Sequence, residues 1–278
     1  MSEDEKTKDV IDFFSNELYF QLKYLHSLPG LPHQRNVGIE FLVANQLLED
    51  SGVVSFLDDD VRVKSDDFQT VSDLFDQNPL AIAIGGFVDE VSKVNSKTLF
   101  RRLALLGSKN SGVILKSGFA MVPFPNKKIM QTQWIPGGMQ NVRFEVFKNE
   151  LFDGKIRMYG EDVEFYSRIN KYGQILCSSH LPVKHLEAVE EKDNSRAVQC
   201  FTDGFRWTMA SNRRYGVKKY AVLFSTANLV LADAILWIFD SRGCHKESLL
   251  GHIDFFSNLI RRNQVQQFVD HPGSGPNP

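Results

Sequence analysis

The chain has 278 residues, of which 42% are hydrophobic and 24% charged, the balance of an ordinary folded globular protein. A formal net charge of −2 at pH 7 gives no general attraction to nucleic acid, so we expect no nucleic-acid partner. The polar start lacks the apolar core of a signal peptide, and the three widely spaced cysteines form no zinc or disulfide pattern, which predicts a cytoplasmic protein.

The first elements alternate between helix and strand. The spacing of apolar residues predicts an amphipathic helix over residues 4–18 and a strand over Tyr19–Leu25. After a Pro/Gly turn, a second helix runs from His33 to Leu48, and a buried strand covers Gly52–Asp58. This order favours a mostly parallel sheet with helical crossovers.

The same periodicities continue to about residue 186, and helices follow. We therefore expect an α/β domain over residues 1–186, a helical C-terminal region over 187–270 and a disordered tail over 271–278. Further strands are expected over 80–88, 112–122, 174–178 and 181–185, further helices over 65–77 and 161–171, and a last amphipathic segment over 252–268.

Tyr220–Phe239 is strongly apolar and follows four basic residues, which predicts contact with a membrane surface through residues 213–240. Asp233 near its middle would be costly in a membrane-spanning helix. A helix buried against the rest of the protein avoids that cost and is the first interpretation, followed by a helix that lies in the membrane interface and then by a true span.

The acidic stretch Phe56-Leu-Asp-Asp-Asp-Val61 ends the strand predicted over Gly52–Asp58. Three carboxylates at one strand end repel each other and raise each other's pKa unless a cation neutralises them. Hard divalent ions such as Mg²⁺ or Mn²⁺ prefer carboxylate oxygens and bridge readily to phosphate. The stretch predicts a site for a metal ion and a diphosphate at the edge of the sheet. The alternative is a solvated acidic turn.

Two later motifs combine glycines with an aromatic residue or with carboxylates that could take part in binding or catalysis. In Trp134-Ile-Pro-Gly-Gly138, the glycines permit close backbone approach or a positive φ. In Gly160-Glu-Asp162, two carboxylates begin a helix, where they suit the helix dipole. The alternative for these acids is a helix cap without catalytic function.

The order of the motifs Gln34-Arg-Asn-Val-Gly-Ile39, Phe56–Val61, Gly137-Gly138, Gly160-Glu-Asp162 and His185 resembles that of family 2 glycosyltransferases. The resemblance covers roughly residues 10 to 186 and implies a GT-A-like α/β fold. It also implies metal-dependent, inverting transfer of a sugar from a nucleotide-diphosphate sugar to a hydroxyl of a glycan or lipid-linked glycan.

The resemblance assigns roles residue by residue. Asp162 would be the base that deprotonates the acceptor, with Glu161 beside it. The metal ligands would be Asp58, Asp60 and His185. Residues near the donor would be Arg35, Asn36, Asp58, Asp59, Trp134, Gly137 and Gly138; Trp134 suits equally well a position in the core.

One departure from the family pattern concerns the start of the chain. The family opens with a strand–helix–strand that grips the nucleotide base, and nothing before residue 10 supplies it, so we expect an N-terminally truncated fold. This leaves an inactive remnant or a membrane-associated binding protein as alternatives. A further alternative is a haloacid-dehalogenase-type phosphatase with Asp58 as nucleophile and Asp60 as acid/base. It explains neither Gly137-Gly138 nor the Gly-Glu-Asp helix.

Overall fold

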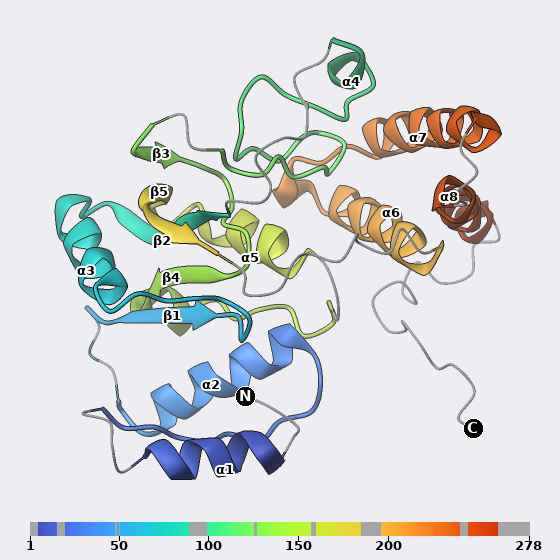
Figure 1. Ribbon diagram of the computed structural model, residues 1–278. Helices are drawn as coiled ribbons and strands as arrows, with labels where there is room; N and C mark the ends of the chain where they lie inside the picture. The colour runs from blue at the N-terminus through green and yellow to red at the C-terminus, as the bar shows by residue number, and fades with distance from the viewer. Residues whose placement is uncertain are drawn as a thin grey trace.

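A computed structural model describes residues 5–15, 20–47, 49, 51–88, 99–124, 127–156, 160–184, 196–239 and 244–260. A five-stranded sheet has helices on both of its faces, and three C-terminal helices form a unit at one end (Figure 1). The strands are β1 (Val53–Leu57), β2 (Ala81–Val88), β3 (Ile129–Gln131), β4 (Met139–Arg143) and β5 (Gln174–Val183). The helices are α1 (Glu5–Phe14), α2 (Leu31–Ala44), α3 (Asp67–Gln77), α4 (Leu99–Leu103), α5 (Glu161–Ile169), α6 (Arg196–Ser211), α7 (Lys219–Phe239) and α8 (Cys244–Ile260), with 3₁₀ turns η2 (Phe144–Lys148) and η3 (Arg213–Tyr215).

The strands lie in the order β1-β4-β2-β5-β3, which confirms an α/β fold with a sheet flanked by helices. The prediction of a mostly parallel sheet was wrong: only β2 and β5 pair in parallel, and β1–β4, β2–β4 and β3–β5 are antiparallel. β1 and β2 do point the same way, because both run opposite to β4. β4 is inserted between them, and the alternation of side chains in a strand carries no information about such a neighbour.

Two predicted strands are absent from the described residues. Residues 20–28 form an extended segment without a strand, and 112–122 contain only the isolated bridge between Ile114 and Ala120. A strand needs a neighbour for its backbone hydrogen bonds, and alternation alone does not supply one. The two strands expected over 174–185 form the single strand β5, which shifts register where it pairs with Gly86 and Phe87.

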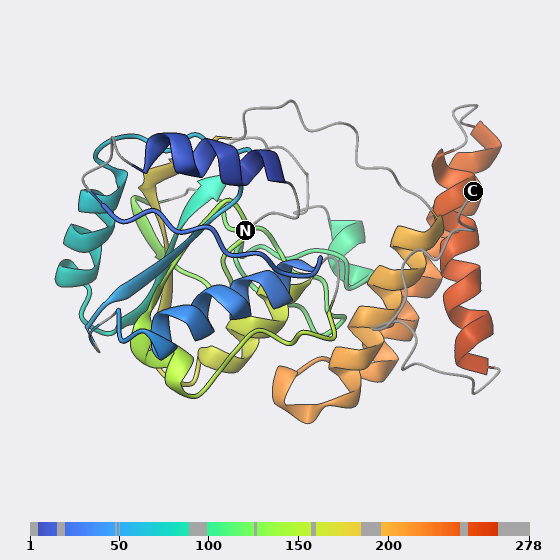
Figure 2. The same cartoon turned by 90° about the horizontal axis from the view of Figure 1, so that it is seen from below.

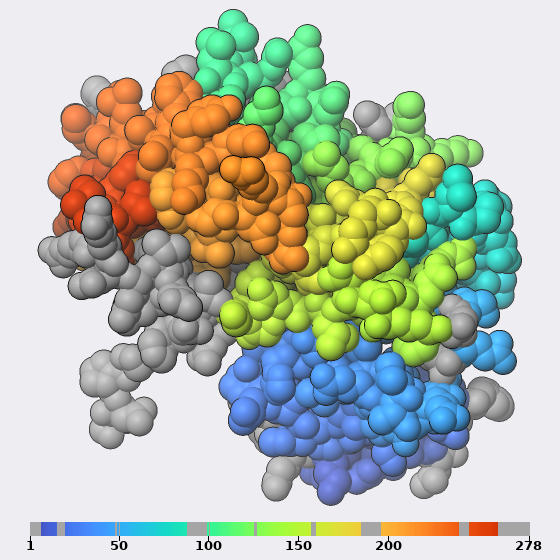
Figure 3. Space-filling model, turned by 180° about the vertical axis from the view of Figure 1, so that it is seen from behind, coloured from blue at the N-terminus to red at the C-terminus, as the bar shows by residue number. Residues whose placement is uncertain are grey.

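The apolar core continues from the sheet into the C-terminal helices. Val142, Phe165 and Ile175 belong to the same buried cluster as Met209 of α6 and Phe255 of α8. The α6–α8 unit nevertheless stands to one side of the sheet (Figure 2), and α1 and α2 lie at the opposite end of the molecule (Figure 3). The sheet and the α6–α8 unit, which the predicted boundary at residue 186 would separate, therefore share one buried core.

Candidate active site

The acidic turn after β1 meets the glycine loop before β4, because antiparallel pairing sets Leu57 opposite Met139. The Asp58 amide donates to the carbonyl of Gly138 at 3.1 Å, and the Val61 amide closes the turn on the Asp58 carbonyl at 3.3 Å. Asp58 and Asp60 are half-buried and Asp59 is exposed. The turn thus presents its carboxylates beside the Gly137-Gly138 backbone.

Gly137 and Gly138 are both required by their surroundings. A Cβ on Gly137 would lie 3.0 Å from Asp58 Oδ2 and 4.0 Å from Asp162 Oδ2, so the loop passes beside both carboxylates. Gly138 has a φ of +99°, and its Cβ would lie 2.5 Å from Val183. The expected close approach and positive φ are therefore confirmed.

The first turn of α5 brings two further carboxylates to this place. Glu161 and Asp162 follow Gly160 and interact favourably with the partial positive charge at the N-terminus of the helix. Glu161 is only 8% exposed. Burial, followed by the charge of Asp162, raises the pKa of Glu161 well above its ordinary value of 4.5. Glu161 therefore favours the protonated form at neutral pH.

Arg35 of α2 lies at the centre of these acids. Its guanidinium nitrogens lie 3.8 Å from Asp58 Oδ1, 3.6 Å from Glu161 Oε1 and 3.7 Å from Asp162 Oδ1. These are ion-pair distances that exceed the length of a hydrogen bond. We call the four residues the Arg35 cluster.

Two polar atoms of the Arg35 cluster, Arg35 Nη1 and Asp162 Oδ1, are buried without a hydrogen-bond partner. A buried polar atom left unpaired costs about 1–3 kcal/mol, and such atoms in a native protein call for an explanation. The two atoms lie 3.7 Å from each other, which is an ion-pair distance but too long for a hydrogen bond. Arg35 Nη1 can therefore still donate a hydrogen bond to a ligand, and Asp162 Oδ1 can still accept one.

The carboxylates of the acidic turn suit a divalent cation as its ligands. Burial raises the pKa of Asp58 despite the opposing effects of Arg35 and the Gly138 backbone, and the charges of Asp162 and Asp60 raise it further. A bound cation would relieve this repulsion, and carboxylate oxygens are the ligands that Mg²⁺ and Mn²⁺ prefer. Asp58 and Asp60 therefore fit such an ion.

The third predicted metal ligand, His185, lies outside the described residues. Among those that the structure describes, no three His, Cys, Asp or Glu side chains are grouped as a ready metal site. The amide of Arg62 donates to the carbonyl of Lys184 at 3.0 Å, which holds the segment after the acidic turn against the end of β5. The described part of the site thus offers a pair of carboxylates.

A cavity of about 1300 Å³ opens beside the acidic turn. It lies between the extended segment at 21–25, α2 and β1, which pairs on one side only within the described sheet. Its volume is sufficient for a ligand of nucleotide size. Its lining is mixed, with apolar Leu22, Leu25, Ile39, Leu42, Val54 and Phe56 and polar Gln21, Gln34, Arg35, Asn45, Ser55, Asp58, Asp59 and Asp60.

Asn36 and Trp134, both predicted to lie near the donor, make hydrogen bonds within the protein. The Asn36 amide donates to the Phe152 carbonyl at 2.9 Å and accepts from the Phe152 amide at 3.0 Å. Phe152 in turn packs under the Arg35 guanidinium at 5.1 Å. Trp134 is buried in the core, and its indole donates to the Met121 carbonyl at 3.1 Å. The contacts predicted for these two residues with a donor stay predictions.

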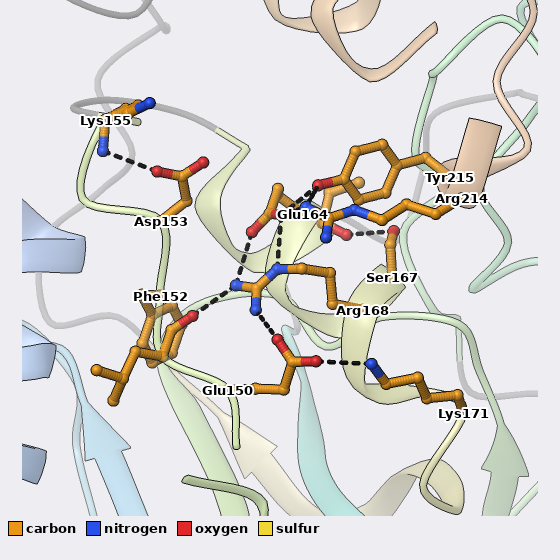
Figure 4. Close-up of polar contacts among 12 residues, drawn as sticks. Glu150, Phe152, Asp153, Lys155, Glu164, Ser167, Arg168, Lys171, Arg214 and Tyr215 are labelled. Carbon is orange, nitrogen blue, oxygen red and sulfur yellow. Dashed lines mark hydrogen bonds and ion pairs between the residues drawn. The ribbon is translucent and has the colours of Figure 1, made fainter. Parts of the chain in front are cut away.

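A charged network that the sequence analysis did not assign holds α5 in place (Figure 4). Arg168 donates to both oxygens of Glu164 at 2.7 and 2.9 Å, to the Leu151 carbonyl at 2.6 Å, and to Glu150. The Tyr215 hydroxyl donates to Glu164 at 2.5 Å, which ties in η3. The i,i+4 spacing of Glu164 and Arg168 was the available signal.

A comparison with curated proteins agrees with an enzyme that transfers sugars. No model of a protein family matches the chain. The rhamnosyltransferase WbbL of Escherichia coli (strain K12) is 25% identical over 195 residues, which cover 68% of this chain and 71% of the relative. This similarity supports a glycosyltransferase.

Among solved structures, the mannosyltransferase PcManGT from Pyrobaculum calidifontis, in complex with GDP-Man and Mn²⁺, has a TM-score of 0.48 at 9% identity. The superposition covers 94% of this chain and 76% of that one.

Proposed function

We propose that the protein transfers a sugar from a nucleotide-diphosphate sugar to an acceptor hydroxyl, with inversion at the anomeric carbon and with a divalent ion. The observation that carries this proposal is that Arg35 and Asp58, which line a cavity of about 1300 Å³, lie beside Asp162. The similarity to a rhamnosyltransferase supports it. The phosphatase alternative leaves Glu161 and Asp162 without a function, although Asp162 lies beside Asp58.

The donor would occupy the cavity between α2 and β1, with its diphosphate toward the acidic turn. Asp58 and Asp60 would hold Mg²⁺ or Mn²⁺, which when bound neutralises the charge that develops on the leaving diphosphate. Asp59, exposed at the tip of the turn, is in a position to accept hydrogen bonds from ribose or sugar hydroxyls. Arg35 keeps the surrounding carboxylates from repelling one another.

The acceptor would approach Asp162. Its unpartnered Oδ1 can accept the proton of the attacking hydroxyl, while the new bond to the anomeric carbon forms and the bond to the diphosphate oxygen breaks. Attack from the side opposite the leaving group inverts the configuration. Glu161, held in its protonated form, can donate a hydrogen bond to the acceptor or to Asp162. The acceptor class in this proposal is a glycan or lipid-linked glycan hydroxyl.

The test is release of nucleoside diphosphate from a panel of UDP-, GDP- and dTDP-sugars, with Mn²⁺ or with EDTA. We expect turnover of one donor class with Mn²⁺ and its loss with EDTA. Asp162→Asn should lower kcat by about 10²–10⁴-fold, the usual contribution of a general base, with an unchanged melting temperature.

Asp76→Asn is the matched control, because Asp76 is an exposed aspartate on α3, and it should leave kcat unchanged. Turnover by Asp162→Asn at the rate of the unmodified protein would overturn the proposed base. A folded protein that binds a nucleoside diphosphate with Mn²⁺ but turns over no donor would favour a binding protein.

A further inference from the structure

Helix α7 exposes most of its large apolar residues and buries two of its polar ones. Six of its exposed residues recur every three or four positions and so lie on one face of the helix. Leu231 is 60% exposed and Ile238 is 76% exposed. By contrast, Ser225 and Thr226 are completely buried. We call these six residues the α7 stripe: Tyr220, Phe224, Ala227, Leu231, Ile235 and Ile238. Leu236 and Trp237 are also exposed but lie off this face of the helix.

The polar residues of α7 are bonded to its neighbouring helices. Ser225 and Thr226 lie against the Arg206 guanidinium of α6. Asp233 accepts from the Ser248 hydroxyl of α8 at 2.6 Å and lies 3.0 Å from His245. The charge that would interrupt an apolar surface therefore faces inward, and the α7 stripe contains no charged side chain.

The inner contacts favour a helix that lies on a surface over one that crosses a membrane. Within the described residues, one helix, Lys219–Ile238, is long and apolar enough to span, with a mean hydropathy of 1.8. Only 22% of this window is buried, so α7 is not an ordinary core helix. Crossing would pull Thr226 and Asp233 away from Arg206 and His252, and stranding buried charged groups costs several kcal/mol.

Basic residues gather at the N-terminal end of the α7 stripe. Arg213, Arg214, Lys218 and Lys219 precede or begin the helix, and all four are exposed. The Lys218 amide donates to the carbonyl of Lys116 at 2.8 Å, so the backbone of a fifth basic residue, also exposed, lies at the same end. A basic cluster next to an apolar face is the pattern of helices that bind anionic lipid surfaces.

We propose that the outward face of α7 binds the surface of a bilayer that contains anionic lipids. The α7 stripe would enter the boundary between headgroups and acyl chains, and the basic cluster would contact lipid phosphates. α7 runs along the outer side of the α6–α8 unit, where no described element covers it (Figure 1). The inference stands independently of sugar transfer, although η3 at the basic end also reaches Glu164 of α5 through Tyr215.

The test is flotation of the full chain with vesicles of phosphatidylcholine, alone or mixed with phosphatidylglycerol. We expect flotation with the anionic vesicles and little with the neutral ones. Leu231→Asp should weaken binding about tenfold or more, since it replaces a leucine buried in the lipid by a charge. Lys218→Glu combined with Lys219→Glu should reduce binding and remove its dependence on salt.

The matched control is Leu80→Asp, an equally exposed leucine (69%) in the turn before β2, which should float like the unmodified chain. Circular dichroism confirms that each variant is folded. Equal flotation of Leu231→Asp and the unmodified chain would overturn the proposal. A dimer in lipid-free solution that Leu231→Asp dissociates, without vesicle binding by the unmodified chain, would assign the α7 stripe to a second copy instead.

Discussion

Two buried arginines, each surrounded by acids, have opposite hydrogen-bonding states. Arg206 donates to Asp203 at 2.7 Å and to the Ser117 carbonyl at 2.7 Å, and it also contacts the hydroxyls of Ser225 and Thr226. Arg35 approaches its three carboxylates no closer than 3.6 Å, and its Nη1 has no hydrogen-bond partner.

This difference distinguishes a cluster that stabilises the fold from one that is available to bind a ligand. The residues Asp203, Arg206, Asp233 and His252, which we call the Arg206 cluster, use most of their polar atoms on one another and so join α6, α7 and α8. One buried atom of this cluster, His252 Nε2, makes no hydrogen bond and lies 3.5 Å from Asp233 Oδ2. In the Arg35 cluster, Arg35 Nη1 and Asp162 Oδ1 make no hydrogen bond, and Arg35 and Asp58 line the cavity. A buried network in which most polar atoms are bonded stabilises a fold, whereas one whose central guanidinium makes no hydrogen bond to its carboxylates costs stability and can persist where a ligand completes it.

The largest expected effect comes from breaking the Arg206 cluster. Asp203→Asn removes the charge that faces both Arg206 and His252, and losing one partner of a buried ion pair costs about 3–5 kcal/mol. Urea unfolding followed by circular dichroism measures this loss. Asp58→Asn in the Arg35 cluster should change stability by less than about 1 kcal/mol, since no hydrogen bond of its carboxylate to a described side chain is broken. Equal losses in the two variants would contradict the distinction.

The second effect is a dependence on pH. Burial disfavours the charged imidazole, but hydrogen bonds to Asp203 and Asp233 raise the pKa of His252 to about 9 from an ordinary 6.5. A raised pKa stabilises the fold fully below pH 6.5, and this contribution disappears as the pH rises through 9. It amounts to about 3 kcal/mol. The free energy of unfolding should therefore fall between pH 6.5 and 9, and His252→Gln should flatten this part of the curve. A curve of the same slope in the variant would show that other groups cause the fall.

In the Arg35 cluster, replacing the buried, titratable carboxyl group of Glu161 should increase stability. Because the pKa of Glu161 is raised by burial and by Asp162, folding is favoured below its ordinary pKa of 4.5 and disfavoured as the pH rises above it. A glutamine at position 161 does not titrate, so the Glu161→Gln variant does not lose this stability as the pH rises. We expect it to be more stable than the unmodified protein by about 1–3 kcal/mol at pH 8 and hardly at all at pH 4. Thermal unfolding at both pH values measures the difference. A destabilised Glu161→Gln variant at pH 8 would place Glu161 among residues that support the fold.

The smallest effect concerns the space beside Asp58. Gly137→Ala places a methyl group 3.0 Å from Asp58 Oδ2, where it displaces the carboxylate. We expect an increase of about tenfold in the KM for the donor, equivalent to about 1.4 kcal/mol, with little change in melting temperature. Gly154→Ala is the control, since a Cβ there meets nothing within 4 Å. A KM that does not respond in the Gly137 variant would place the donor elsewhere.

The features predicted correctly from the sequence depend on local signals. The acidic end of β1, the glycines at 137 and 138 and the acids that open α5 are recognised from a few neighbouring residues each. The direction and neighbours of β4 were missed, because they depend on pairing between distant segments. Asp203 and His252 are 49 residues apart, and no periodicity connects them. For the same reason, Asp233 read as a break in an apolar segment, whereas in the fold it faces Ser248 and His245.

The most direct test of the distinction between the two clusters is the shift in melting temperature that Mn²⁺ and a nucleoside diphosphate produce together. A ligand that binds only the folded state at 100 times its Kd adds about 2.7 kcal/mol. We predict an upward shift for the unmodified protein with one of UDP, GDP or dTDP, its loss in Asp58→Asn, and its retention in Asp203→Asn. A shift of equal size in Asp58→Asn, or none with any of the three diphosphates, would contradict the assignment of the Arg35 cluster as the ligand site.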